Sequence, residues 1–144
     1  VAITPGAGFV PVWSAIVIGA LVSPICYFTM NFLKKKLKID DALDAFGCHG
    51  IGGIWGGIAT GLFARSDINP VAQWNGLVFG DARLCGAVVL WIGISIAVAV
   101  VGSLICAGIT RLFTPLRVEH KEELLGLDLT QHGEQAYPSF NGFD

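Results

Sequence analysis

Three long stretches of the chain contain no charged residue, at 12–33, 45–64 and 84–110. The hydrocarbon core of a bilayer is about 30 Å thick and takes about 20 apolar helical residues to cross, and each stretch reaches that length. Strands are excluded, because open sheet edges cannot be satisfied in lipid and three segments cannot close a barrel. The pattern therefore predicts an all-α membrane protein with three transmembrane helices, at about 12–33, 41–64 and 84–113.

The distribution of basic residues predicts how these helices are oriented. Seven lysines and arginines follow the first or the third stretch, whereas two lie in the connection between the second and third: Lys34, Lys35, Lys36, Lys38, Arg111, Arg117 and Lys121 against Arg65 and Arg83. Short loops rich in lysine and arginine stay in the cytoplasm. We therefore expect a multi-pass protein of the cell membrane whose last segment, 114–144, is a cytoplasmic tail.

Composition agrees with a membrane protein and narrows the choice of partners. The chain is 53% apolar and 14% charged, against about 25% charged in soluble domains. A net charge of −2 argues against a nucleic-acid partner, and the four cysteines match no zinc or disulfide spacing, so neither metal nor cofactor is expected. The first residues, VAITP, have neither the methionine of a natural start nor the basic region of a signal peptide.

A histidine lies within the second uncharged stretch. A helix beginning at Asp40 or Asp41 would place His49 about 12 Å along its axis, near the middle of the bilayer. A lone histidine in a soluble core is usually structural, but an ionisable residue within a membrane span usually lines an ion or proton path. Low polarity favours the neutral ring, which can donate one hydrogen bond and accept another. His49 therefore suits the passage of a small neutral molecule, with Ala45 and the aromatic Phe46 on the same helix face.

Acidic residues and glycines around this histidine have structural interpretations. Asp41 and Asp44 precede the second helix, where aspartate commonly caps the first turn, and a polar network near an inner pore mouth is the alternative role. Four glycines recur along one face, a spacing that lets helix backbones approach closely, namely Gly50, Gly53, Gly57 and Gly61. These residues therefore predict a capped helix that packs tightly against its neighbours.

Three segments of the sequence resemble the ammonium transporter (Amt/Mep) family. DDALDAFGCHGIGG is similar to the family signature, VAITPGAGFV to the segment before its ninth helix, and LRVEHKEELLGLDLTQHGEQAYP to its cytoplasmic tail. The motifs occur in the family's order and cover nearly the whole chain. The related Rh proteins share the fold but lack the Asp-x-Phe-Gly-x-His-Gly motif, so this chain resembles them less.

The resemblance implies a particular place within a larger transporter. The chain would supply helices nine to eleven and the tail of an eleven-helix, inverted-repeat fold that assembles as a homotrimer with one pore per subunit. His49 matches the second of two paired pore histidines, whereas the first histidine and the outer aromatic cage belong to helices outside this sequence. The implied function is the transport of ammonium, which loses its proton outside so that ammonia crosses a hydrophobic pore, without enzymatic chemistry.

The resemblance also assigns the tail a regulatory role. In the family this region helps couple subunits and contacts PII-type signal proteins in many prokaryotes. The matching positions here are Leu127, Asp128, Thr130, His132 and Gly133. Phosphorylation of Thr130 would add charge beside acidic residues and disrupt docking. Without the resemblance, an ordinary solvated tail is the simpler interpretation.

Two other functions remain open from the residues alone. The chain could be a short three-helix interaction or assembly subunit with no conduction path of its own, in which His49 would bond between helices. A membrane enzyme that uses Cys48 and His49 is disfavoured, because adjacent residues of a helix point about 100° apart. We therefore expect membrane transport, with the assembly subunit as the alternative.

Overall fold

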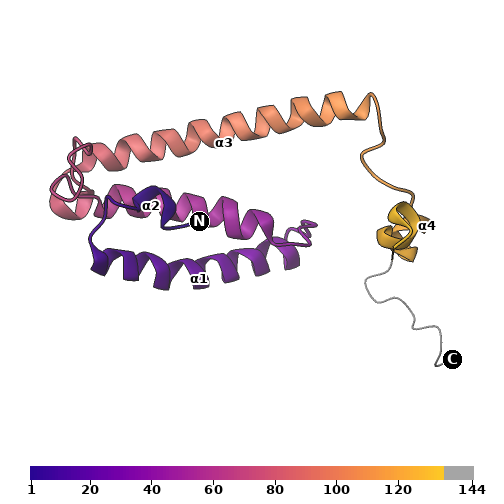
Figure 1. Cartoon of the computed structure of the whole chain (residues 1–144), viewed down its shortest axis with the longest axis horizontal. Coiled ribbons are helices and arrows are strands. Elements are labelled where there is room, and N and C mark those ends of the chain that lie inside the picture. The colour runs from indigo at the N-terminus through magenta and orange to yellow at the C-terminus, as the bar shows by residue number, and fades with distance from the viewer. Residues whose placement is uncertain (135–144) are drawn as a thin grey trace. The chain divides into compact units, whose positions relative to one another are not determined.

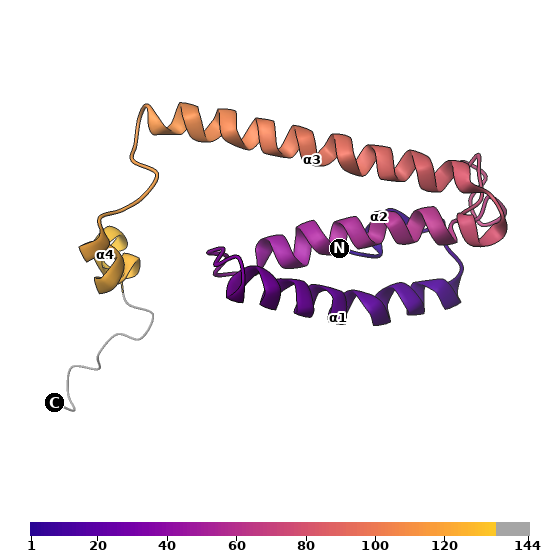
Figure 2. The ribbon, with the colours of Figure 1, turned by 180° about the vertical axis from the view of Figure 1, so that it is seen from behind.

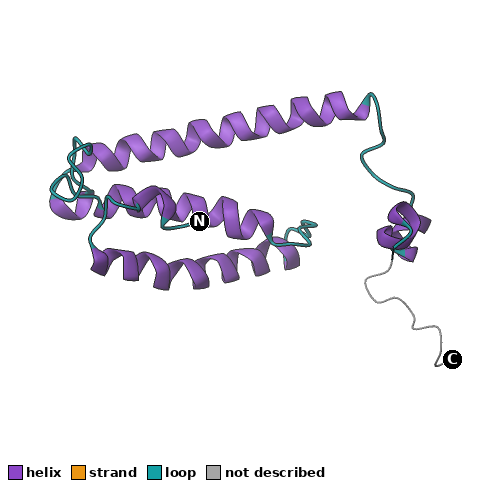
Figure 3. Cartoon of the chain, in the orientation of Figure 1, coloured by secondary structure: helices purple, strands orange, loops and turns teal. Residues whose placement is uncertain are grey.

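The computed structural model describes residues 1–134, and the last part of the predicted cytoplasmic tail, 135–144, lies outside the described residues. Those 134 residues are helical or irregular and contain no strand (Figure 3). The longer elements are α1 (Val12–Lys35), α2 (Gly52–Phe63), α3 (Ala82–Arg111) and α4 (His120–Leu125). Short helical turns lie at Thr4–Gly6, Phe46–Ile51, Leu77–Phe79 and Asp128–His132, labelled η1 to η4. The all-α prediction agrees with this architecture.

Two of these helices have the length and apolar composition needed to cross a membrane. They are α1, with 24 residues, and α3, with 30 residues (Figure 1). Their bounds lie within two residues of the predicted 12–33 and 84–113. The middle segment is different, because six π-helical residues in η2 precede the twelve α-helical residues of α2. The count of three transmembrane helices therefore stays a prediction.

The middle helix begins later than the sequence predicted. It starts at Phe46 instead of Asp40 or Asp41, because the backbone of Asp44 is left-handed, with φ of 53°, and interrupts the helix. His49 therefore lies less than one turn after the helix begins, and the distance of about 12 Å from Asp41 is wrong, since it counted non-helical residues as helix. Helix η2 also carries more residues per turn than an α-helix, so faces assigned at 3.6 residues per turn do not hold across it.

The first compact unit, Val1–Val98, has a small core built on α1 and α2. These helices lie side by side, as the opposite views in Figures 1 and 2 show. Ala2, Ile18 and Ala59 are buried at its centre, and Trp55 packs against them. The indole Nε1 of Trp55 donates a hydrogen bond across the helix pair to the Ile18 carbonyl oxygen, 3.1 Å away. Because both a polar and an apolar contact join α1 to α2, the middle segment has a defined register on α1.

The second unit, Ala99–Asp144, contains the end of α3 and the described part of the tail. Within the tail, α4 ends at Gly126, whose positive φ of 94° suits glycine at the end of a helix. Six residues of the tail, His120–Leu125, are therefore helical.

Candidate functional site

The turn before η2 is held by the carboxylate of Asp41. Its two oxygens each accept one backbone hydrogen bond, Oδ1 from Ala45 N–H and Oδ2 from Phe46 N–H, both at 2.9 Å. These amides have no partner within the helix, so the Asp41 carboxylate caps the start of η2 from four and five residues earlier in the chain. Burial by itself would raise the pKa of Asp41, but the amides of this first turn, together with the nearby Lys34 ammonium, hold the pKa below its ordinary value.

The same turn is tied to the end of α1 by an ion pair. Lys34 Nζ lies 2.6 Å from Asp44 Oδ1. The Asp44 carbonyl also accepts a hydrogen bond from Cys48 N–H at 2.8 Å. One turn further on, a Cβ atom placed on Gly47 would lie 2.7 Å from Met30 Sδ, so α1 approaches η2 too closely for a larger residue. Helix α1 therefore fixes the start of η2 at two points.

Removing the Asp41 carboxylate is expected to loosen this segment. In an Asp41→Ala variant, backbone amides of residues 45–50 should exchange hydrogen several-fold faster, because two helix-end donors lose their acceptor. Asp40→Ala is the matched control, since Asp40 is exposed and makes no hydrogen bond within residues 1–134. Peptide-resolved hydrogen–deuterium exchange measures both variants. Equal exchange in the two variants would show that Asp41 does not hold the segment.

The acid limit of this cap follows from the lowered pKa of Asp41. A carboxylate with a lowered native pKa stabilises the native state above its unfolded pKa of about 3.9 and loses that effect as pH falls through the native value. The contacts of Asp41 with Ala45 and Phe46 are therefore complete at neutral pH and are lost only below pH of about 3.9.

The three predicted conduction residues lie at the start of this middle segment, on the surface of the isolated chain. Ala45, Phe46 and His49 are exposed, with Phe46 at 51%. The Phe46 ring rests over Gly50, where a Cβ atom would come within 2.7 Å of two ring carbons. The His49 ring makes no hydrogen bond within residues 1–134, so both of its nitrogens are available to groups outside the described chain. Phe46 and His49 thus both lie on the helical segment that Asp41 caps.

The four predicted packing glycines divide into two groups. Gly57 and Gly61 face α3, where added Cβ atoms would lie 3.0 Å from Ile92 Cδ1 and from Cys85 Cα respectively. Gly50 instead accommodates Phe46 of its own segment, and Gly53 meets its first neighbour, Val1, only at 4.0 Å. The four-residue spacing therefore identifies a close approach to another helix at two of its four positions.

The closest approach of another backbone segment to α2 involves a glycine outside that stripe. A Cβ atom on Gly56 would overlap the carbonyl group of Ala2, with the carbonyl carbon 2.8 Å away and Cα 2.9 Å away. Helical spacing could not reveal this contact, because the segment before α1 makes it and not a second helix.

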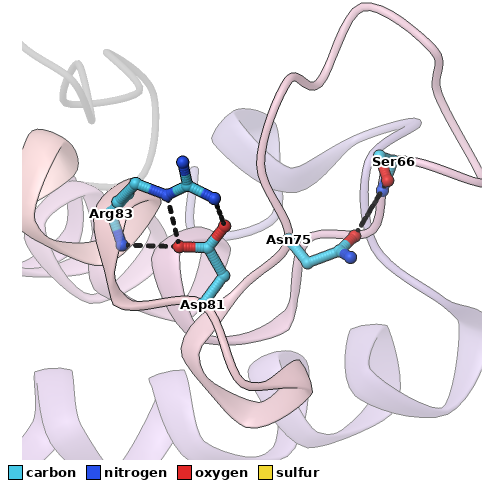
Figure 4. Close-up of polar contacts among 4 residues, drawn as sticks. All are labelled: Ser66, Asn75, Asp81 and Arg83. Atoms are coloured by element: carbon cyan, nitrogen blue, oxygen red, sulfur yellow. Dashed lines mark hydrogen bonds and ion pairs between the residues drawn. The ribbon is translucent and has the colours of Figure 1, made fainter.

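A polar cluster in the connection between α2 and α3 was also missed by the sequence analysis. Asn75 Oδ1 accepts hydrogen bonds from Ser66, from its backbone N–H at 2.8 Å and from its hydroxyl at 3.0 Å (Figure 4). Asp81 accepts from Arg83 Nε at 3.1 Å and from Nη2 at 2.9 Å. Hydrogen bonds from the Arg83 side chain and backbone lower the pKa of Asp81. The Asp-x-Arg spacing in the sequence could have indicated the pair formed by Asp81 and Arg83. These hydrogen bonds order the connection between α2 and α3.

The described tail positions form a small helical unit of their own. Thr130 Oγ1 donates to the Gly126 carbonyl at 2.9 Å, and Gln131 Nε2 donates to Glu122 Oε2 at 3.0 Å. Leu127 and Leu129 are 44% and 50% exposed. The turn η4 carries Asp128 at its start and His132 at its end, and Gly133 follows with a positive φ of 66°. The candidate regulatory residues thus lie together, with the Thr130 hydroxyl already engaged.

Two long apolar helices, with a histidine on a helical segment between them, fit a helical membrane protein by length and composition. Comparison with known families is more specific, because the model of the Ammonium Transporter Family matches residues 1–137. The chain belongs to the ammonium transporter family, whose members are embedded in membranes.

Individual relatives agree with this assignment across kingdoms. The chain is 49% identical over 137 residues to an ammonium transporter of Bacillus subtilis and 46% identical over 136 residues to ammonium transporter Amt1 of Archaeoglobus fulgidus. It is 36% identical over 151 aligned residues to ammonium transporter MEP2 of Saccharomyces cerevisiae. The alignments cover 94–95% of this chain but 34%, 34% and 29% of these relatives. The chain thus spans about a third of the length of the curated relatives it matches.

Proposed function

We propose that the protein containing this chain transports ammonium across the cell membrane and that His49 lies in the conduction path. The observation that carries the proposal is the family match over residues 1–137, which includes the histidine motif. Three similar proteins are named ammonium transporters. Transport involves no covalent change in the substrate, so the proposed activity is not enzymatic.

The chemistry of the exposed segment supports passage of a neutral molecule. A neutral imidazole offers one donor and one acceptor, which matches ammonia, itself both a donor and an acceptor. A bare cation buried at the same place without a counter-ion would have a large desolvation cost. We propose that ammonium gives up its proton to water on the outer side before it reaches His49, and that ammonia passes between His49 and groups supplied by the rest of the protein. Phe46, whose ring rests over Gly50, is a second proposed lining residue of the path.

We further propose the assembly and regulation that the family resemblance implies. The complete protein would have an eleven-helix, inverted-repeat fold, form a homotrimer and keep the tail in the cytoplasm. The tail would bind a neighbouring subunit or a PII-type regulatory protein through its exposed apolar residues. Leu127 and Leu129 support a docking role, since both leave about half of their side chains exposed. Asp128, Thr130, His132 and Gly133 would shape that surface.

Transport by purified protein tests the proposal directly. The complete protein that contains residues 1–144 is reconstituted into liposomes, and an inward ammonium gradient is applied. We expect saturable uptake of radiolabelled methylammonium and no comparable flux of potassium or sodium. Liposomes containing residues 1–144 alone are the control and should show no uptake, because the chain supplies only one side of the proposed path. Absence of flux with the complete protein would refute transport and favour the assembly-subunit alternative.

A further inference from the structure

The connection between α2 and α3 contains two adjacent residues that can react with each other, Asn75 and Gly76. Asparagine is a thermolabile residue, and the residue that follows it sets the rate of its spontaneous deamidation. The backbone nitrogen of that residue attacks the asparagine Cγ, and glycine hinders the attack least because it has no Cβ atom. The sequence therefore contains a reactive pair that has no part in the proposed conduction path.

The packing of the connection requires glycine at position 76. A Cβ atom there would overlap the Leu62 carbonyl group, with the carbonyl carbon 2.5 Å away, and would lie 2.8 Å from the backbone nitrogen of Phe63. Both neighbours belong to the backbone of α2, so they cannot move aside as a flexible side chain could. The close approach to the end of α2 thus requires the residue that makes Asn75 most reactive.

The same packing engages the attacking nitrogen. Gly76 N–H donates a hydrogen bond to the Ala64 carbonyl oxygen at 2.7 Å, and the Gly76 carbonyl accepts one from Phe79 N–H at 2.9 Å. Gly76 is therefore held on both sides, and it is buried. Its nitrogen must give up the hydrogen bond to Ala64 before it can lose its proton and attack, so the closed connection slows the reaction.

The side chain that is attacked is held as well. Asn75 Oδ1 accepts hydrogen bonds from the backbone N–H and the hydroxyl of Ser66, at 2.8 Å and 3.0 Å (Figure 4). Asn75 is half-buried and lines an open cavity of about 350 Å³ together with Arg65 and Asp67. Water can therefore reach the amide, while the two hydrogen bonds from Ser66 restrict its rotation.

We propose that Asn75 is a deamidation site that reacts when the connection opens and that the hydrogen bonds to Ser66 and Ala64 protect while it is closed. In the open state the Gly76 nitrogen loses its proton to water and bonds to Asn75 Cγ. The side-chain nitrogen takes up a proton and leaves as ammonia, which gives a cyclic imide. Water then adds to one of the two imide carbonyls and breaks its bond to nitrogen, which leaves aspartate or isoaspartate at position 75. This site depends neither on ammonium conduction nor on the orientation of the chain.

The two products differ in the contacts that the fold can keep. Aspartate retains a side-chain oxygen that can accept both hydrogen bonds from Ser66, so the connection can close again. Isoaspartate adds one carbon atom to the main chain before Gly76, which moves Gly76 out of register with Ala64 and Leu62. Isoaspartate therefore prevents the connection from closing.

Deamidation of the complete purified protein tests this site. The protein is incubated at mildly alkaline pH, either folded in mild detergent or denatured, and peptide mass spectrometry measures aspartate and isoaspartate at position 75. We expect the folded protein to react about tenfold or more slowly than the denatured protein, because opening breaks several hydrogen bonds. Asn69 is the internal control, since it precedes Pro70, whose nitrogen has no hydrogen, and it should react slowly in both states.

A serine substitution tests the protection by Ser66. Ser66→Ala removes one hydrogen bond to Asn75 and should raise the rate in the folded protein about threefold, with the denatured rate unchanged. Ser95→Ala is the matched control, because Ser95 is exposed on α3 and makes no side-chain hydrogen bond within residues 1–134. We expect Ser95→Ala to react at the rate of the unmodified protein.

Four results would overturn the proposal. These are no reaction at Asn75 in the denatured protein, equal rates in the folded and denatured protein, equal rates in folded Ser66→Ala and the unmodified protein, and an equal increase in Ser95→Ala. Thermal unfolding midpoints of the same preparations show whether Ser66→Ala is folded. If it is not, the comparison of folded and denatured unmodified protein decides the proposal by itself.

Discussion

Replacing His49 with alanine in the complete protein is expected to reduce saturable methylammonium uptake about tenfold or more. The variant loses a donor and an acceptor in the proposed path, and two neutral hydrogen bonds of about 0.5–1.5 kcal/mol each correspond to a loss of this size. The space left by the ring also admits water, which lowers the desolvation cost for cations. We therefore expect potassium current to appear as ammonium selectivity falls. Liposome uptake and membrane-current recordings measure the two effects.

The neighbouring cysteine provides the control for this experiment. Cys48 is exposed on the same π-helical segment, so Cys48→Ala tests the effect of altering this backbone region without removing the imidazole. We expect uptake and selectivity of Cys48→Ala to stay close to those of the unmodified protein. If His49→Ala transports with unchanged rate and selectivity, the imidazole is not in the conduction path.

Replacing Gly56 with alanine is expected to be the most destabilising glycine substitution in α2. The added Cβ atom would overlap the backbone carbonyl of Ala2, which has no rotamer with which to move away. Overpacking of this kind costs about 1–3 kcal/mol. The segment before α1 should detach from α2, with a lower thermal unfolding midpoint in detergent and faster proteolysis near the N-terminus.

Gly53→Ala is the matched control for Gly56→Ala. Gly53 lies on the same helix, and its added Cβ atom would first meet Val1 at 4.0 Å, an ordinary contact distance. Alanine is favoured over glycine within a helix by about 0.5–1 kcal/mol, so this variant should unfold at the same or a higher temperature. Similar midpoints for the two variants would show that the contact between Gly56 and Ala2 does not limit stability.

Helical class and the outer two helices were predictable because they depend on composition over long windows. Uncharged runs of this length leave few alternatives, and the bounds of α1 and α3 differ from the prediction by two residues at most. The start of the middle helix was not predictable in the same way. Asp40, Asp41 and Asp44 are all good capping residues, and only the left-handed backbone of Asp44 decides where the helix begins.

The candidate site was likewise predictable only in part. The motif identified Phe46 and His49, and local sequence identified Asp41 as a capping residue. The pair formed by Lys34 and Asp44 depends on how α1 returns toward η2, which a pattern of residues does not encode. Gly56 was missed for a similar reason, since its partner Ala2 lies more than fifty residues away in sequence. Contacts between distant segments therefore limited the prediction more than the chemistry of single residues did.

The π-helical winding of Phe46–Ile51 has a consequence for how this family can vary in sequence. A π turn closes its hydrogen bond over one residue more than an α turn does, so it amounts to an α-helix with a single insertion. One residue could be lost here by rewinding to an α turn, with α2 left in place on α1. Such a deletion would rotate the imidazole about the helix axis while preserving the scaffold, so the direction of the proposed conduction residue can change without loss of the fold.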